Sequence, residues 1–351
     1  MAQIISNPWR GQGLPDLPPG AALNPAAVAR LLALCPAHVP TPLQDCPALA
    51  QTLGVARVSL KDERPRMGLG SFKALGAAYA IAHDASVAVE HSGKPWSEAL
   101  TGRGYVTASA GNHGLSVAAG ARIFGARAVI YLAETVPEGF AARLREKGAQ
   151  VVRAGATYED SMQAAEAAAG DGQLDLLSDS SWPGYTAPSF RVMEGYTQMA
   201  QEIGDQIETA PTHVFLQAGV GGLAAAMAST LRNVWGAAPR MIVVEPDAAP
   251  ALIESIKAAH VVTTSGPVSQ MGRLDCKTPS MLALAELARD ADDFATITEA
   301  EAQHAVDQLD QVGIATTPSG AAGLAAALAG LGDLNADAHL LCIISEGPES
   351  G

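Results

Sequence analysis

The sequence is poor in aromatic residues and in positive charge, and each shortage excludes a class of partner. Aromatic side chains make up 5% of the 351 residues, which is too few for a surface that stacks nucleobases. Lys and Arg together number 22 against 36 Asp and Glu, so the formal net charge is −14. Because no cluster of basic residues stands out either, we expect neither a nucleic acid nor an anionic membrane as a partner.

Cysteines and long apolar runs are scarce as well. The cysteines Cys35, Cys46, Cys276 and Cys342 are scattered and form no CxxC pair, which favours free thiols in a reducing compartment over a metal site or a disulfide framework. No apolar run reaches the ~20 residues of a membrane-spanning helix. The N-terminus also lacks the basic-then-apolar layout of a signal peptide. The sequence therefore predicts a cytoplasmic protein without a membrane span.

What the sequence does have is apolar residues, 48% of the chain, in strands that alternate with helices. This alternation predicts an α/β fold with mostly parallel sheets and right-handed crossovers. We expect a smaller α/β domain over residues 84–185, inserted in a large domain of residues 1–83 and 186–351. Residues 1–27 are expected to form an irregular arm, and residues 185–207 one long helix. The expected strands cover residues 55–60, 104–109, 126–133, 149–154, 174–178, 213–217, 241–244, 294–297 and 339–344.

The segment Gly68-Leu-Gly-Ser-Phe-Lys-Ala places Lys73 between a predicted strand and a helix of small apolar residues. The positive end of the helix dipole and apolar surroundings both disfavour an ammonium group, so we expect the pKa of Lys73 to be lowered. A neutral amine of this kind can form a Schiff base with an aldehyde. A lone lysine at a helix start is more often simply solvated, so the case for chemistry depends on three further motifs.

A second strand-to-helix junction consists of Ser109, Ala110, Gly111, Asn112 and His113. Small residues let a ligand approach the backbone, and the helix N-terminus offers free N–H donors. Asn112 adds an amide, so the turn suits a carboxylate or phosphate together with a neutral hydroxyl. An ordinary Asn/Gly turn is the alternative interpretation, with His113 as a cap or packing residue.

A third junction is rich in glycine and consists of Gly219, Val220, Gly221, Gly222 and Leu223. Its glycines let successive backbone N–H groups face one phosphate. No Lys-Ser/Thr follows as in a Walker loop, and the glycine spacing is not GxGxxG, so a dinucleotide is not favoured.

Ser345 ends the last buried strand, where a hydroxyl either hydrogen-bonds a pyridine nitrogen or caps a turn. An amine, an amide, a phosphate-binding loop and a strand-end hydroxyl are together the groups needed to hold pyridoxal 5'-phosphate. Each falls at the carboxyl end of a predicted strand, where open α/β sheets bind ligands. The sequence therefore predicts pyridoxal phosphate as the cofactor, and no metal.

With these motifs the chain resembles the fold-type II, or tryptophan-synthase-β-like, family of pyridoxal-phosphate enzymes, and within it the diaminopropionate ammonia-lyases. The second likeness rests on three segments beside the lysine motif: Lys61-Asp-Glu-Arg, Asp179-Ser-Ser-Trp-Pro-Gly-Tyr-Thr and Gly272-Arg-Leu-Asp-Cys-Lys-Thr-Pro-Ser. The resemblance implies two three-layer α/β domains with the cofactor in the cleft between them. It also implies a homodimer.

The resemblance assigns a role to each motif. It implies that Lys73 holds the cofactor aldehyde, that Asn112 contacts the ring hydroxyl and that Ser345 faces the ring nitrogen. Gly219 to Leu223 would bind the phosphate, and the turn from Ser109 to His113 would bind the substrate carboxylate.

The implied reaction is β-elimination from a small amino acid, most simply 2,3-diaminopropionate to pyruvate and ammonia. Lys73 would remove the Cα proton, and Asp179 is the candidate proton donor for the leaving group; a structural cap is the alternative for Asp179. Ala110 stands where the bacterial lyases that act on both stereoisomers have an aspartate credited with handling the D-isomer. This difference favours the L-isomer as substrate.

Other activities fit the same framework. A serine, threonine or hydroxyaspartate dehydratase is supported by Ala110 and by Thr316-Thr-Pro-Ser-Gly-Ala, and opposed by the segments around Asp179 and Cys276. A β-replacement synthase is a further alternative. A non-catalytic regulator that binds pyridoxal phosphate or an amino acid is opposed by the intact Lys73, Asn112 and Ser345.

Overall fold

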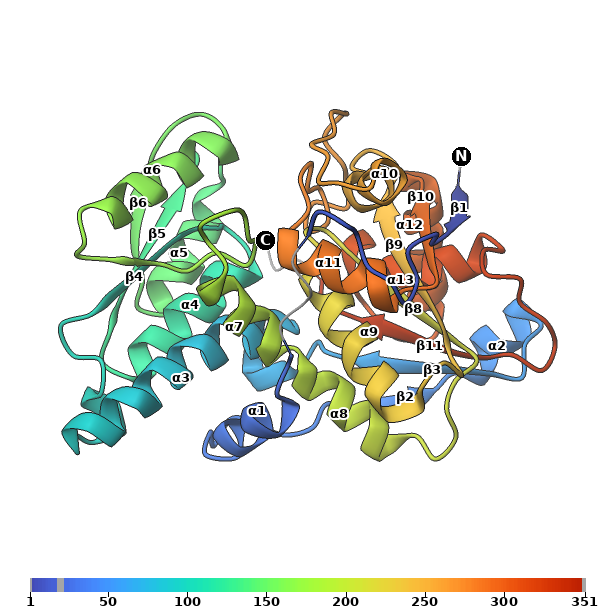
Figure 1. Cartoon of the computed structure of the whole chain (residues 1–351), viewed down its shortest axis with the longest axis horizontal. Helices are drawn as coiled ribbons and strands as arrows, with labels where there is room; N and C mark the ends of the chain where they lie inside the picture. Colours follow the sequence, from blue (N-terminus) through green and yellow to red (C-terminus); the bar gives the residue numbers. More distant parts are fainter. Residues whose placement is uncertain (1, 18–21, 349–351) are drawn as a thin grey trace.

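The computed structural model describes residues 2–17 and 22–348, which form two sheets flanked by helices (Figure 1). The larger sheet has seven strands, and only its two edge pairs, β1 with β10 and β2 with β3, are antiparallel. Its strands are, in spatial order, β1 (Gln3–Ser6), β10 (Asp293–Ile297), β9 (Arg240–Pro246), β8 (His213–Gln217), β11 (His339–Ile344), β3 (Arg57–Asp62) and β2 (Leu43–Asp45).

The smaller sheet is parallel throughout and comes from one continuous stretch of chain, on the left of Figure 1. Its strands are, in spatial order, β6 (Gln150–Arg153), β5 (Arg127–Leu132), β4 (Gly104–Ala108) and β7 (Asp175–Leu176). Every residue of β4 and of β11 is buried. Strands covered by helices on both faces have no solvent side, which explains their continuous apolar sequence.

The helices cover both sheets, and α7 lies between them in Figure 1. They are α1 (Pro25–Leu32), α2 (Pro47–Leu53), α3 (Lys73–Ser92), α4 (Asn112–Ile123), α5 (Glu138–Glu146), α6 (Tyr158–Gly170), α7 (Ala187–Gly195), α8 (Thr197–Gln206), α9 (Gly222–Trp235), α10 (Ala251–Ala258), α11 (Met281–Asp290), α12 (Glu299–Gln311) and α13 (Pro318–Leu328), with short 3₁₀ turns at Arg66–Gly68 and Trp96–Glu98. In the described part of the chain, no helix is long and apolar enough to cross a membrane.

The expected strand-helix alternation is present, with several differences. The single helix predicted over 185–207 is two helices that meet at Tyr196, where the Tyr196 N–H donates to Met193 O at 3.1 Å and the Thr197 hydroxyl donates to Glu194 O at 2.7 Å. The strand β2 was not expected. The arm predicted at 1–27 contains a strand, β1, which pairs with β10. No element was expected over α11, although its Met, Leu, Ala and Glu residues favour helix and most of them are buried.

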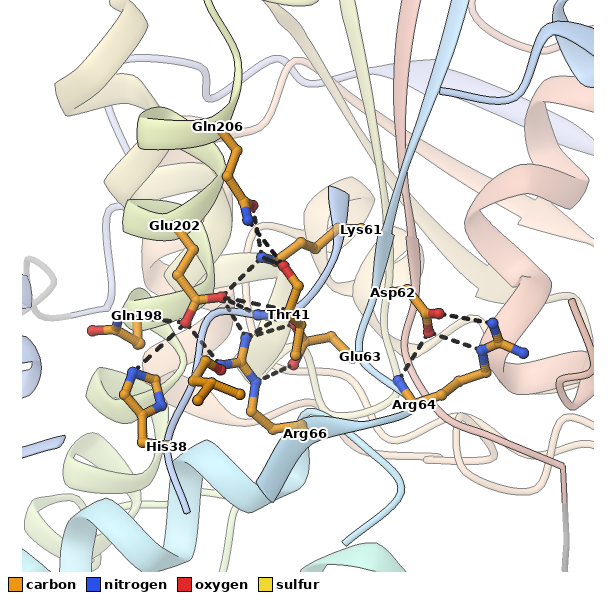
Figure 2. A network of polar contacts seen from close by, with 11 residues as sticks. His38, Thr41, Lys61, Asp62, Glu63, Arg64, Arg66, Gln198, Glu202 and Gln206 are labelled. Atoms are coloured by element: carbon orange, nitrogen blue, oxygen red, sulfur yellow. Dashed lines mark hydrogen bonds and ion pairs between the residues drawn. The ribbon is translucent and has the colours of Figure 1, made fainter. Parts of the chain in front are cut away.

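A buried ionic network fixes the chain between β3 and α3 (Figure 2). The Arg66 guanidinium donates to both oxygens of Glu63 and both oxygens of Glu202, which comes from α8. Lys61 Nζ donates to Glu202 and to Thr41 O, each at 2.8 Å. The side chains of Lys61, Glu63 and Arg66 are 0% exposed. The network therefore ties the segment that leads to Lys73 to helix α8.

Attraction between the opposite charges of this network offsets the free-energy cost of burying them. Burial by itself would raise the pKa of Glu202, but hydrogen bonds and charge from Arg66, together with the charge of Lys61, outweigh it and hold that pKa at about 2. Burial also lowers the pKa of Lys61 below its ordinary value, against the attraction of Glu202. Glu202 is therefore a carboxylate over the whole physiological range.

Candidate active site

Backbone contacts place Lys73 beside the end of β11. The Phe72 N–H donates to Ser345 O at 3.1 Å, and Ser71 forms an isolated bridge with Glu346. Lys73 is the first residue of α3, as the sequence predicts. The lysine and the strand-end serine, which are far apart in the sequence, are thus neighbours in the fold.

Lys73 forms an ion pair with Asp179, which follows β7. Its Nζ also lies 5.3 Å from the ring centroid of Phe72 and 5.7 Å from that of Tyr196. Burial disfavours the ammonium, but the charge of Asp179 outweighs it and raises the pKa of Lys73 above its ordinary value. The expected lowering of this pKa is wrong, because the Asp179 carboxylate has a stronger effect than burial.

The turn from Ser109 to His113 leads into α4, whose first residue is Asn112. The Asn112 amide donates to the carboxylate of Glu346, so the turn is joined to the end of β11. His113 Nε2 lies 2.8 Å from Leu177 O and donates to it, which leaves Nδ1 as a bare acceptor without a partner among the described residues. Burial lowers the pKa of His113, so the ring is neutral.

Glu346 was not identified from the sequence, although it connects several parts of the site. Its carboxylate accepts hydrogen bonds from Asn112 and Thr317, and Arg273 Nε lies 3.7 Å from it. The Arg273 guanidinium also covers Gly111, since a Cβ at that glycine would lie 2.9 Å from one of its nitrogens. No local sequence pattern around Glu346 indicates that Asn112, Thr317 and Arg273 are its partners, because only the fold brings these residues together.

The glycine-rich loop joins the same region. The Gln217 amide donates to Ile343 O at 2.9 Å, which connects β8 to the end of β11, and Val220 O accepts a bond from Ser280 N. Gly222 and Leu223 are the first residues of α9, so their N–H groups have no acceptor within the helix.

Several features of the site fit a phosphate ester. Gly221 has φ of +98°, which a residue with a side chain rarely adopts, and a Cβ at Gly219 would lie 3.0 Å from Arg273 O and from Cys276 Sγ. The loop therefore needs its glycines to bring backbone donors close to an anion. The Tyr196 hydroxyl is a buried polar group without a hydrogen-bond partner among the described residues. The residues present accordingly fit pyridoxal phosphate.

Cys276 lies against the glycine-rich loop but carries no charge. Burial raises the pKa of its thiol to about 12, and the negative charge of Asp179 adds to the effect. A thiol in this state is a poor nucleophile. No group of three or more His, Cys, Asp and Glu side chains in the described ranges is arranged to hold a metal ion.

Known proteins resemble the chain over different lengths. The diaminopropionate ammonia-lyase of Escherichia coli (strain K12) is 32% identical over 257 residues, which are 69% of this chain and 64% of that enzyme, so the chain spans less than two thirds of it in this alignment. A serine dehydratase-like protein of Homo sapiens is 30% identical over 299 residues, which are 84% of each chain.

Solved structures match almost the whole chain. The crystal structure of the Escherichia coli diaminopropionate ammonia lyase in complex with an aminoacrylate-PLP azomethine reaction intermediate covers 99% of this chain and 94% of that chain, with a TM-score of 0.86 and 28% identity. The fold is therefore that of the fold-type II pyridoxal-phosphate enzymes. The family pattern described as "Pyridoxal-phosphate dependent enzyme" matches residues 34–346, and the chain belongs to this family.

Proposed function

We propose that this protein catalyses the β-elimination of ammonia from 2,3-diaminopropionate, with a preference for the L-isomer, and yields pyruvate and ammonia. The observation that carries the proposal is the match of 99% of the chain to a diaminopropionate ammonia lyase whose structure contains an aminoacrylate reaction intermediate. Ala110 in the Ser109–His113 turn supports the preference for the L-isomer.

The side chains around Lys73 supply what the cofactor needs. Lys73 would hold its aldehyde, Asn112 its ring hydroxyl and Ser345 its ring nitrogen. The backbone donors of residues 219–223 would hold its phosphate. When bound, pyridoxal phosphate supplies an electron sink that makes the Cα proton of an amino acid acidic.

Lys73 and Asp179 would handle the protons of the reaction. Lys73 Nζ removes the Cα proton, because it is the basic nitrogen at the junction of the strand ends. The paired Asp179 carboxylate accepts a proton from Lys73 Nζ and delivers it to the leaving β-nitrogen. The aminoacrylate product then hydrolyses to pyruvate and ammonia.

The Ser109–His113 turn would bind the substrate carboxylate through the N–H groups at the start of α4. The Arg273 guanidinium over Gly111 adds positive charge to this turn. The neutral His113, held through Leu177 O, positions the turn and takes no part as a base.

We also propose the organisation around this site. The large domain comprises residues 1–83 and 186–351, and the smaller domain residues 84–185. The separate origins of the two sheets support this division, while α3 runs across its first boundary. The protein is proposed to be a cytoplasmic homodimer, and Cys35, Cys46, Cys276 and Cys342 are free thiols, as a reducing compartment requires. Light scattering on the purified holoenzyme tests the dimer.

A dehydratase acting on serine, threonine or hydroxyaspartate is the second candidate. It is supported by the serine dehydratase-like relative, which is 30% identical over 84% of the chain, and by Ala110. The same residues would act, with a hydroxyl group as the leaving group.

Keto-acid release distinguishes the two candidates. Cofactor-saturated protein is assayed in parallel with L-2,3-diaminopropionate, its D-isomer, L-serine, L-threonine and hydroxyaspartate. Rapid turnover of L-diaminopropionate alone is the expected result; turnover of a hydroxy amino acid with diaminopropionate inert would make the protein a dehydratase.

The variant Lys73→Ala tests the site itself. We expect it to lose turnover and the visible absorbance of bound cofactor. The variant lacks the Lys73 amine that would form the Schiff base with the cofactor aldehyde. Lys94→Ala, on an exposed segment, is the matched control and should behave as the wild type. An active, yellow Lys73→Ala variant would refute the assignment.

A further inference from the structure

Tyr196 occupies the break between α7 and α8 and is almost completely enclosed. Its side chain is 1% exposed, and its ring packs edge-on against Phe72, with the centroids 5.0 Å apart. Phe72 directly precedes Lys73, so the break between the two helices brings a phenol ring to the edge of the candidate active site.

A glycine in α3 makes room for this ring, and the start of α9 lies against its other side. A Cβ at Gly76 of α3 would lie 2.6 Å from Tyr196 Cε1 and 2.7 Å from its hydroxyl oxygen, closer than a side chain allows. A Cβ at Gly222 of α9 would lie 3.6 Å from Cε2, an ordinary contact distance. The phenol is therefore positioned between the first turns of α3 and α9, the two helices that begin with Lys73 and with the end of the glycine-rich loop.

The hydroxyl at the tip of this ring is buried, and no described residue accepts its proton. Buried hydroxyls nearly always have their proton accepted, because an unpaired donor loses its bonds to water without replacement. Burial raises the pKa of Tyr196 to about 12, against the nearby Lys73 ammonium, which donates toward the phenol oxygen and lowers it, so the group is a neutral phenol with a proton to donate. Lys73 can only donate, and its charge is paired with Asp179, so it leaves the Tyr196 proton without an acceptor. What suits the hydroxyl is an acceptor.

We propose that the Tyr196 hydroxyl donates a hydrogen bond to the phosphate of the bound cofactor, as a side-chain ligand in addition to the backbone donors of residues 219–223. The start of α9 directs its free N–H groups and the positive end of its dipole toward an anion. A neutral donor at the same place adds a bond to the phosphate without adding a second buried charge beside Lys73.

The proposal concerns cofactor binding, so it is tested without substrate and stands or falls independently of the proposed reaction. Apo-protein of the wild type and of Tyr196→Phe is titrated with pyridoxal phosphate, and separately with pyridoxal, which lacks the phosphate. We expect the Kd for pyridoxal phosphate to rise about tenfold to a hundredfold in the variant, as for the loss of a hydrogen bond to a charged group. The Kd for pyridoxal should be the same in both proteins.

A matched control and a second readout guard against a merely structural effect. Tyr105→Phe removes another buried tyrosine hydroxyl, which lies outside the site and donates to Asp84 at 2.8 Å. This variant should leave both Kd values unchanged. Because Tyr196→Phe removes an unpaired polar group, its apo-protein should melt no lower than the wild type. Its gain in Tm on adding pyridoxal phosphate should nevertheless be smaller, and the phosphorus NMR signal of the bound cofactor should be displaced.

Two results would overturn the proposal. An unchanged Kd for pyridoxal phosphate in Tyr196→Phe would mean that the phosphate does not accept from this hydroxyl. An equal loss of affinity for pyridoxal and for pyridoxal phosphate would place its partner at Lys73 or at the pyridine ring.

Discussion

Glu202 accepts from both cations of the buried network, so replacing it tests whether that network stabilises the segment before Lys73. Glu202→Gln keeps the shape of the side chain but removes its negative charge. Lys61 and Arg66, both with 0% exposed side chains, would then have Glu63 as the remaining carboxylate of the network (Figure 2). A buried cation that loses its partner cannot recover its hydration without disturbing the fold.

The loss of folding stability that we expect for Glu202→Gln follows from the pKa of Glu202. Its ordinary value of 4.5 falls to about 2 in the folded protein, a difference of about 2.5. At roughly 1.36 kcal/mol for each unit of pKa difference, the lowered pKa of Glu202 corresponds to about 3 kcal/mol of folding stability. The side chain is 3% exposed, so solvent screening reduces this value little. Removal of one partner from a buried ion pair costs a similar ~3–5 kcal/mol.

Urea unfolding of the ligand-free protein, followed by tryptophan fluorescence, measures this loss. A carboxyl whose pKa is lowered by folding contributes its full stability above the unfolded pKa, 4.5 for Glu202, and loses it as the pH falls through the folded value. The difference between the wild type and Glu202→Gln should therefore be constant near neutral pH and shrink below about pH 4.5.

Glu254→Gln is the matched control, because Glu254 pairs with Lys257 at 2.7 Å but both side chains are 40% exposed. An exposed pair of this kind contributes less than about 1 kcal/mol. If Glu202→Gln were as mild as this control, or its effect did not depend on pH below neutrality, the network would not be a source of stability and the reasoning would fail.

Two further variants examine the site. Gly219→Ala places a Cβ 3.0 Å from Arg273 O and Cys276 Sγ, so we expect the loop to shift and the Kd for pyridoxal phosphate to rise at least roughly tenfold. Gly170→Ala adds its Cβ in open space at a residue without a positive φ, and it should leave this Kd unchanged. Asp179→Asn removes the charge that raises the pKa of Lys73, so in the apo-protein the lysine should be acylated faster than in the wild type at one alkaline pH, as followed by mass spectrometry; equal or slower labelling would contradict this.

The sequence predicts where the candidate site lies through signals that are local. Lys73, Asn112 and Gly222 each begin a helix after a predicted strand, and Ser345 directly follows the last strand. Parallel strands bring their carboxyl ends to one edge of a sheet, which unites the motifs after β3, β8 and β11 of the larger sheet. Asn112 follows β4 of the smaller sheet, and its bond to Glu346 joins it to the others.

The side chains that the sequence did not identify are those defined by distant partners. Glu346 binds Asn112 and Thr317 from other parts of the chain, and Tyr196 packs against Phe72 and beside Gly76 of α3. Gly195 and Thr197 beside Tyr196 are poor helix formers and hint at a helix junction, but they do not indicate where the ring lies. The contacts of Glu346 and Tyr196 have no local signal, because they are tertiary.

The pairing of Lys73 with Asp179 shows how a distant partner reverses a local expectation. Burial disfavours a charge on either residue, but each charge stabilises the other: the carboxylate raises the pKa of Lys73, and the ammonium lowers the pKa of Asp179 below its ordinary value against the effect of burial. The charge of Lys73 is therefore the main factor that keeps the pKa of Asp179 low. Any event that neutralises Lys73 removes the main factor that lowers the Asp179 pKa and leaves burial, which raises it. Asp179 then becomes able to hold a proton and to release it to a leaving group, so its acidity depends on the state of the lysine beside it.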